Sequence, residues 1–138
     1  MNYKIISKYI KNLEFNIPNP KTFYLLSKEI SNYKINININ SNQIENNIIE
    51  VQTTLNLIPT KENFEKIKTN ITHSTIVEVT EGVEKKDIEK IILIDVPNEI
   101  YNELRSIFIY IFETSGFKDI KIGENVNFQK LYELRNIQ

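Results

Sequence analysis

Alternation of apolar and polar residues marks the first part of the chain as a run of β-strands. Residues 33–40 read YKINININ, which puts a tyrosine and three isoleucines on one face and a lysine and the asparagines on the other. Residues 49–58 (IEVQTTLNLI) and 64–79 alternate in the same way. Residues 3–15 mix helical and strand spacing, and we favour a strand for their second half. The pattern therefore predicts three or four consecutive antiparallel strands, each with one buried face.

Proline and asparagine predict where these strands are connected. Pro18 and Pro20 end regular structure, because each lacks an amide donor and restricts the residue before it. The apolar residues 23–26 (FYLL) then fall in a loop or one short turn. Residues 41–47 carry Ser-Asn and Asn-Asn pairs that mark a second connection, and residues 59–63 (PTKEN) predict a turn.

The second part of the chain has helical spacing. Residues 85–94 form a first helical stretch, and a long helix follows over residues 97–115. Asp95 can cap this helix, Pro97 fits its first turn, where no amide is missed, and Gly116 supplies a C-terminal stop. Both ends of the long helix are thus predicted from single residues.

The apolar surface of the long helix is wider than one sheet requires. Five residues fall on its main apolar face, and three aromatic residues widen that face to roughly 200° of arc, against the ~100° of an ordinary surface helix. The breadth of this apolar face predicts that the helix packs against two surfaces, its own sheet and a second copy of the chain. The five residues are Ile100, Leu104, Ile107, Phe108 and Ile111, and the three aromatic residues are Tyr101, Tyr110 and Phe112.

The last segment of the chain is short and ends in a second helix. Residues 117–122 have an extended pattern, Gly123 turns the chain, and Asn127 caps a helix over residues 128–135. Strands that come first and helices that come last predict an α+β fold, not alternating α/β units.

Composition limits the class of protein. A chain of 138 residues with 41% hydrophobic and 25% charged residues predicts one globular domain over residues 1–138, with a core that needs no disulfide or metal. The net charge of −1 gives no clustered basic surface for nucleic acid. The absence of cysteine excludes a disulfide frame and a thiolate metal site. We find no signal peptide and no apolar run near the ~18 residues of a spanning helix, so we expect a soluble, cytoplasmic protein.

Candidate catalytic residues are few. His73 is the only histidine, and we interpret it as an exposed or half-buried strand residue because no partner lies at a catalytic spacing. The acidic residues between positions 78 and 95 form a loose run that a solvated face or a helix entry explains. The three glycines are isolated, so there is no phosphate-binding loop. The sequence predicts neither an enzyme nor a cofactor or metal site.

Several motifs, in chain order, resemble the SecB family of protein-export chaperones. Residues 96–98 (VPN) open the long helix, Arg105 lies two turns into it, and Gly-Phe at residues 116–117 ends it. The most recognisable motif is residues 126–132, Val-Asn-Phe-x-x-Leu-Tyr. Residues 13–19, Leu-x-Phe-x-x-Pro-Asn, resemble the first strand of the family and its Pro-Asn step. The resemblance covers nearly the whole chain.

The resemblance implies one four-stranded antiparallel sheet with a long and a short C-terminal helix packed on one face. It also implies a homotetramer, built as a dimer of dimers with the long helices between the dimers. A chaperone of this family is a holdase, which binds unfolded precursor polypeptides in apolar grooves and keeps them export-competent for the Sec translocase.

The resemblance and the pattern together suggest the residues of the binding and assembly surfaces. Each expected client contact could instead fill the core of the single chain, although the phenols of Tyr24 and Tyr132 suit a half-wet groove wall. The expected client-binding residues are Phe23, Tyr24, Leu26, Tyr33, Ile35, Ile37, Phe128, Leu131 and Tyr132. The expected oligomer contacts are Ile107, Ile109, Tyr110 and Phe112.

One expected partner surface departs from the family. SecB proteins dock on the motor ATPase SecA partly through acidic residues on the outer face of the sheet, and the matching positions here are the neutral Asn12, Asn16 and Asn70. The electrostatic part of that contact is therefore missing. Two alternatives stay open, a SecB-like chaperone dedicated to another client such as an antitoxin, and a non-chaperone oligomeric scaffold or small-ligand-binding protein.

Overall fold

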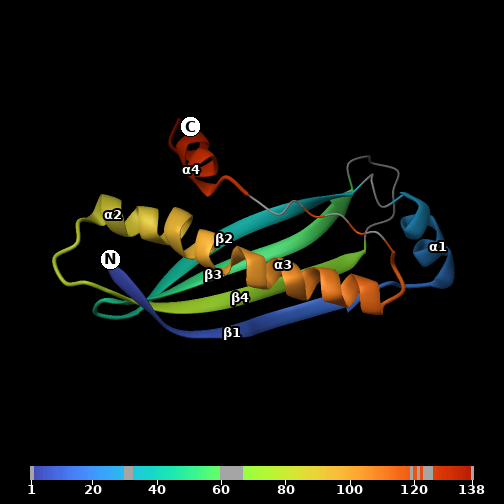
Figure 1. Cartoon of the computed structure of the whole chain (residues 1–138), viewed down its shortest axis with the longest axis horizontal. Coiled ribbons are helices and arrows are strands. Elements are labelled where there is room, and N and C mark those ends of the chain that lie inside the picture. The colour runs from blue at the N-terminus through green and yellow to red at the C-terminus, as the bar shows by residue number, and fades with distance from the viewer. Residues whose placement is uncertain are drawn as a thin grey trace.

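Four antiparallel strands form one sheet with the strand order β1-β4-β3-β2. The computed structural model describes residues 2–29, 33–59, 67–118, 120, 122 and 126–137. Figure 1 shows the strands running along the length of the molecule, with the long helix lying across one face of the sheet. The predicted α+β fold with a four-stranded antiparallel sheet is confirmed. The strands are β1 (Tyr3–Asn16), β2 (Tyr33–Glu45), β3 (Ile48–Pro59) and β4 (Lys68–Val79).

The strand register brings the apolar residues of all four strands onto the same face. Leu55 of β3 pairs with Ile37 of β2 on one side and with Ile71 of β4 on the other, and Ile71 pairs with Leu13 of β1. Because directly opposed residues of antiparallel strands project to the same side, this row is apolar across the sheet. The sheet therefore has an apolar inner face and a polar outer face.

The segment after β1 is a helix, so the prediction of a loop or short turn over residues 23–26 is wrong. Helix α1 spans Pro20–Glu29. The Oδ1 atom of Asn19 accepts the amide of Thr22 at 2.8 Å, as an N-cap does. Pro20 takes the first helical position, where its missing amide costs nothing. The two prolines end a strand here, as predicted, but the second also begins a helix.

Two strand limits also differ from the prediction. β1 covers the whole of residues 3–16, although only its second half was favoured as a strand. β2 continues through Ser41 and Asn42 to Glu45, so these two residues do not form a connection. The turn consists of Asn46 and Asn47, and Asn47 adopts a φ of 65°, which asparagine tolerates better than most residues. The predicted turn beyond Pro59 and the predicted strand start at residues 64–66 lie outside the described residues.

One continuous helical segment runs from Lys85 to Thr114, made up of α2 (Lys85–Lys90), the π-helical turn η2 (Ile91–Asp95) and α3 (Val96–Thr114). Asp95 is therefore not an N-cap: its φ and ψ of −67° and −50° are helical, and its side chain makes no capping hydrogen bond. In a regular α-helix the ring of Pro97 would press on the carbonyl group of Leu93, and the wider π-turn directly before Pro97 relieves this contact. No helix in the described part of the chain is long and apolar enough to cross a membrane.

Helix α3 covers the inner face of the sheet and ends at the predicted residue. Leu104 and Phe108 of α3 and Leu55 of β3 are fully buried in the main core. Gly116 adopts a φ of 103°, and the amide of Phe117 reaches back to the carbonyl of Phe112 at 3.1 Å, which closes the helix. The predicted C-terminal stop is confirmed.

Candidate functional site

The inner face of the sheet is incompletely covered on the β2 side. Ile35, Ile37 and Ile39 of β2 are half-buried, and so is Leu93 of η2, and all four pack against the main core. The π-helical turn η2 contacts both β2 and the last helix, α4 (Phe128–Ile137). We call the four half-buried residues the apolar flank. The predicted client contacts Ile35 and Ile37 thus lie at the border of the core, partly open to solvent.

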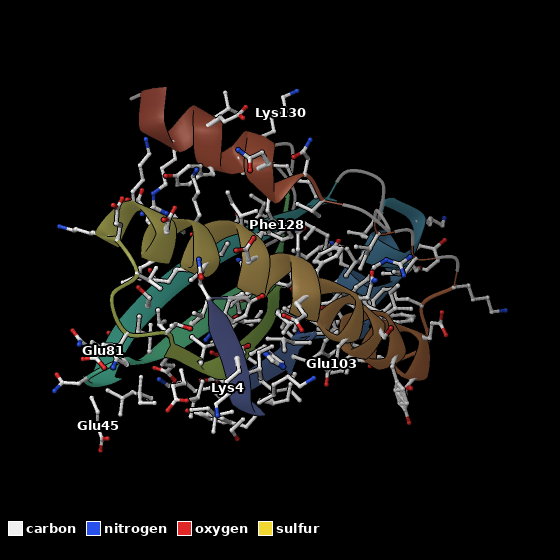
Figure 2. The ribbon with its side chains drawn as sticks, turned by 60° about the vertical axis from the view of Figure 1, so that its left-hand side comes forward. Lys4, Glu45, Glu81, Glu103, Phe128 and Lys130 are labelled. Atoms are coloured by element: carbon white, nitrogen blue, oxygen red, sulfur yellow. The ribbon has the colours of Figure 1, made fainter. Side chains whose placement is uncertain are left out.

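Helix α4 is attached to the rest of the chain by two aromatic side chains. Phe128 and Tyr132, one turn apart, are both buried, and Phe128 meets the ring of Tyr101 edge to face at a centroid distance of 5.9 Å. In Figure 2, Phe128 lies on the side of α4 that faces the long helix, whereas Lys130 points away. The prediction that Phe128 and Tyr132 contact clients is corrected, because both fill the core of the chain. Leu131, between them, is 47% exposed.

The N-terminus of α4 has the predicted cap. The Oδ1 atom of Asn127 accepts the amide of Lys130 at 2.9 Å. This bond satisfies one of the free amides at the start of the helix. The predicted turn at Gly123 lies outside the described residues.

A second uncovered apolar surface lies on α1. Phe23 is half-buried and stacks on Phe117 at a centroid distance of 4.7 Å, whereas Leu26, one turn later, is fully buried. Tyr24 is 56% exposed, with the Nζ atom of Lys28 4.2 Å above its ring, and Leu25 beside it is also exposed. We call Phe23, Tyr24 and Leu25 the α1 patch. Leu26 is a core residue because the helix turns it toward the sheet, so its assignment as a client contact is corrected.

The side chain of Tyr33, the remaining predicted client contact, lies outside the described part of the chain. Its backbone begins β2 and pairs with Pro59. Its role as a client contact therefore stays a prediction.

A third apolar surface runs along β1 and α3. The Oη atom of Tyr3 donates to Glu99 at 2.9 Å and Lys8 pairs with Glu103 at 3.0 Å, so β1 and α3 run side by side. Further along, Leu13 lines one cleft with Ile111. The exposed apolar residues of β1 were not predicted. The first half of this strand has helical spacing in the sequence, so it was not recognised as a strand. We call Ile6, Ile10, Leu13, Ile107 and Tyr110 the β1–α3 surface.

The predicted oligomer contacts have different surroundings: Ile107 and Tyr110 belong to this surface, Ile109 packs at the border of the core, and Phe112 lies inside it. Tyr110 is 60% exposed, and Ile107 and Ile109 are half-buried. Phe112 is fully buried, stacked at 4.9 Å on Phe108, so the prediction that it contacts another copy is corrected. The apolar surface that α3 leaves exposed is therefore narrower than its sequence suggests, because Phe112 packs in the core of the single chain.

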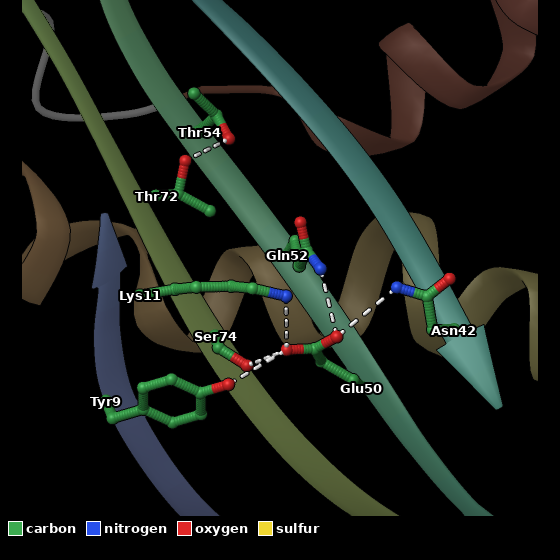
Figure 3. Close-up of polar contacts among 8 residues, drawn as sticks. All are labelled: Tyr9, Lys11, Asn42, Glu50, Gln52, Thr54, Thr72 and Ser74. Carbon is green, nitrogen blue, oxygen red and sulfur yellow. Dashed lines mark hydrogen bonds and ion pairs between the residues drawn. The ribbon is translucent and has the colours of Figure 1, made fainter. Parts of the chain in front are cut away.

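The outer face of the sheet holds a buried carboxylate that the sequence did not reveal. Glu50 of β3 is only 7% exposed, and its two oxygens accept hydrogen bonds from all sides (Figure 3). These bonds, first from Ser74 and then from Gln52, lower the pKa of Glu50 to about 2, although burial opposes the shift. The donors lie on all four strands: Tyr9 at 3.1 Å, Lys11 at 3.4 Å, Asn42 at 3.3 Å, Gln52 at 2.9 Å and Ser74 at 2.6 Å.

The positions expected to contact SecA lie on this outer face. Asn12 pairs with Thr72, Asn16 with Lys68 and Asn70 with Glu14, and these residues share the face of Glu50. Asn12 donates to Glu14 at 3.4 Å. Other contacts on this face join neutral groups: the amides of Asn36 and Asn56 meet at 3.1 Å, and the hydroxyls of Thr54 and Thr72 at 3.0 Å. The outer face is therefore a network of amides and hydroxyls around the carboxylates of Glu14 and Glu50.

His73 lies on the inner face and is buried, contrary to the prediction of an exposed or half-buried residue. It pairs with Ile10 and Thr53 across the sheet, and its Nδ1 atom lies 3.2 Å from the hydroxyl of Thr75. Burial lowers the pKa of His73, which favours the neutral ring. The side chain fills a place in the inner layer between small residues, as a core histidine does.

An amphipathic sheet with a broad helix and three uncovered apolar surfaces defines a protein that holds other polypeptides. The chain belongs to the SecB family: the family model described as preprotein translocase subunit SecB matches residues 1–138. Its role is that of a chaperone in protein export.

Two relatives support this assignment, and one solved structure has a similar fold. It is 43% identical over 135 residues to a candidate protein-export protein SecB of Pelagibacter ubique (strain HTCC1062), across 97% of this chain and 96% of the relative. It is 24% identical over 143 residues to a protein-export protein SecB of Anaplasma phagocytophilum (strain HZ), across 94% of this chain and 90% of the relative. The fold is similar to that of a SecB-like chaperone of Mycobacterium tuberculosis in complex with an antitoxin peptide, with a TM-score of 0.66, 8% identity and coverage of 91% and 88%.

Proposed function

We propose that this export chaperone is a holdase that binds extended segments of unfolded precursors on the apolar flank and the α1 patch. The observation that carries the proposal is apolar surface left uncovered around a complete core, in particular the half-buried isoleucines of β2 and the exposed Tyr24 and Leu25. Burial of apolar area and main-chain hydrogen bonds both hold a client without reading its side chains closely. The proposed site needs no catalytic residue and no cofactor.

The β1–α3 surface is the proposed contact between copies in a homotetramer, built as a dimer of dimers. In support, Ile6, Leu13 and Tyr110 are large apolar residues that the single chain leaves about half exposed or more. Each could contribute about 1–3 kcal/mol when fully buried. A stable interface of ~1,200–2,000 Å² needs several such side chains, and this surface supplies them on two adjacent elements.

The proposed place of action is the cytoplasm, where precursors pass from the chaperone to the Sec translocase. A contact with SecA on the outer face would rely on hydrogen bonds, because Asn12, Asn16 and Asn70 are neutral and the carboxylate of Glu50 is held by its own strands. The exposed carboxylate of Glu14, which lies beside Asn12 and Asn70 on this face, would add one charge to the contact, so salt should weaken the contact to a small extent.

A dedicated antitoxin chaperone is the alternative, and export is favoured over it. The solved chaperone with an antitoxin peptide is only 8% identical, so it supports the fold alone. The relative that is 43% identical carries the name of an export protein. Titration of SecA into the purified chain separates the two roles, because only the export chaperone should bind it.

Suppression of aggregation tests the holding function. A reduced, unfolded client is diluted with and without the chaperone, and light scattering is followed. We expect the wild-type chain to suppress scattering at near-equal molar ratio and Tyr24→Ser to suppress it less. Lys21→Ser, an exposed polar change on the same helix, is the matched control and should behave as wild type. Scattering that is unaffected even by a large excess of chaperone would exclude the holdase.

A further inference from the structure

Three buried polar residues interrupt the apolar inner layer of the sheet. They are His73 and Thr75 of β4 and Thr53 of β3, each 2% exposed or less, and we call them the polar band. Two residues from Thr53 in one direction along β3, Leu55 belongs to the main core, and two residues in the other direction Val51 belongs to a second apolar cluster. The polar band therefore lies between two apolar clusters.

The polar band suits a neutral histidine ring better than a charged one. The Nδ1 atom of His73 lies 3.2 Å from the hydroxyl of Thr75. The hydroxyl of Thr53, across the sheet from His73, has no hydrogen-bond partner among the described residues. A proton taken up by the ring would thus place a charge among hydroxyl groups and apolar side chains, which is unfavourable. In agreement, burial lowers the pKa of His73 from its ordinary value of 6.5.

The charged groups that act on His73 come from β1 and α3, and they are paired with each other. Lys8 of β1 is the cross-strand partner of Thr75, and it binds Glu103 of α3 at 3.0 Å. Figure 2 shows Glu103 on the long helix. Glu103 raises the pKa of His73, whereas Lys8 lowers it. A charged ring would attract Glu103 and repel Lys8, so it would act against the ion pair that joins β1 to α3.

The other charged groups on the neighbouring elements have different partners. Glu99 of α3 accepts a hydrogen bond from Tyr3 at 2.9 Å, and Asp95 of η2 acts on the same phenol. Arg105 of α3 donates to a carbonyl of the segment that follows this helix. Glu50 of β3 and its donors lie on the outer face of the sheet. The electrostatic response of His73 therefore depends on Lys8 and Glu103.

We propose that His73 is an acid-sensitive switch of assembly, whose protonation loosens β1 from α3 and separates the copies that meet on the β1–α3 surface. The inference rests on the proposed assembly through that surface. Ile10, a member of this surface that is 41% exposed, pairs directly with His73 across the sheet. A partner that covers Ile10 holds β1 in place and keeps water from the ring, so a separated copy takes up a proton more readily. By linkage, acid then favours the separated copies.

The sign of the pH dependence follows from the burial of the ring. Because burial lowers the pKa of His73, the neutral ring and the assembly are fully stable above pH 6.5, and stability is lost as the pH falls below this value. The chain has a single histidine, and few other side chains titrate between pH 7.5 and 5.5. A pH effect in this window can therefore be assigned to one ring.

Sedimentation velocity of the full chain at several concentrations tests the switch at constant ionic strength. We expect the dissociation constant of the wild type to rise about tenfold or more from pH 7.5 to pH 5.5, the effect of one pKa unit at one ring. His73→Gln, which keeps a polar side chain but cannot take up a proton, should change less than about threefold. An equal rise in both overturns the switch and leaves the assembly intact. A wild type that is monomeric even at pH 7.5 overturns both.

A nuclear magnetic resonance titration of the histidine ring tests the same inference without the His73→Gln variant, whose fold is checked by far-UV circular dichroism. We expect the pKa of His73 in the wild type to lie below 6.5. Glu103→Gln should lower it further and Lys8→Gln should raise it, because the first removes a negative neighbour and the second a positive one. A wild-type pKa of 6.5 or higher, or the same pKa in both variants, overturns the switch.

Discussion

The most specific prediction about stability concerns the carboxylate of Glu50. The hydrogen bonds from Ser74 and Gln52 lower its pKa from 4.5 to about 2 in the folded chain. At about 1.4 kcal/mol per pKa unit, this difference corresponds to ~3 kcal/mol of unfolding free energy at neutral pH. We expect Glu50→Gln to remove about 2–3 kcal/mol, because the side-chain carbonyl of glutamine still accepts part of these hydrogen bonds. The glutamine keeps the size of the side chain but cannot accept as many bonds.

The pH dependence of this loss identifies the charge as its cause. Since folding lowers the pKa of Glu50, the stabilisation is complete above the unfolded value of about 4.5 and disappears as the pH falls toward 2. The difference between wild type and Glu50→Gln should therefore shrink by about half between pH 7 and pH 3. Other carboxylates titrate in both proteins and cancel in the difference.

Urea unfolding followed by far-UV circular dichroism measures the difference, because the chain has no tryptophan for fluorescence. Protein concentration must be held constant, since assembly couples to stability. Glu45→Gln, an exposed glutamate on β2, is the control and should change the unfolding free energy by less than ~0.5 kcal/mol. A loss at Glu50 that is the same at every pH, or that stays below ~1 kcal/mol at neutral pH, would refute the reasoning.

Three further changes have expected outcomes. Asn127→Ala removes a cap whose Oδ1 accepts a first-turn amide of α4 at 2.9 Å; we expect a loss of about 1 kcal/mol, seen as faster amide exchange confined to α4. Gly116→Ala places a Cβ 3.2 Å from the ring of Phe23 at a φ of 103°, and should lower the unfolding free energy by about 1–3 kcal/mol in the same urea titration; no change would contradict the strained position. Tyr110→Lys should shift sedimentation velocity toward smaller species by charging the β1–α3 surface, whereas Tyr24→Lys on α1 should not.

Periodicity and local caps account for the elements that the sequence predicted well. The strand at residues 49–58 and the end of the long helix at Gly116 depend on neighbours in sequence, and both are confirmed. The cap of the last helix at Asn127 is equally local. The missed helix α1 had a local signal too: Asn19 and Pro20 form a cap and a first position, but Pro20 was interpreted only as an end of regular structure.

Burial and long-range polar contacts could not be predicted in the same way. In the sequence, a large apolar residue of the core looks the same as one of an exposed binding surface. Only the packing of the helices shows that Leu26, Phe112 and Phe128 are buried in the core. Glu50 gathers donors from strands that are separated by tens of residues, and its neighbours are defined only once the register is known. Glu14 likewise reaches the outer face beside Asn70 through the register of β1 with β4.

The two edges of the sheet differ in a way that suits two kinds of partner. β1 leaves Ile6, Ile10 and Leu13 exposed to about half of their full area, which a single chain rarely tolerates and which a permanent partner can cover. β2 keeps Ile35, Ile37 and Ile39 half-buried, and only Ile44 near its end is exposed, so most of this edge can stay vacant without exposing a large apolar area. A surface that is stable when vacant and gains apolar contacts when filled is what reversible holding of a client requires. We therefore expect changes on β1 to alter assembly first, and changes on β2 to alter client binding while assembly persists.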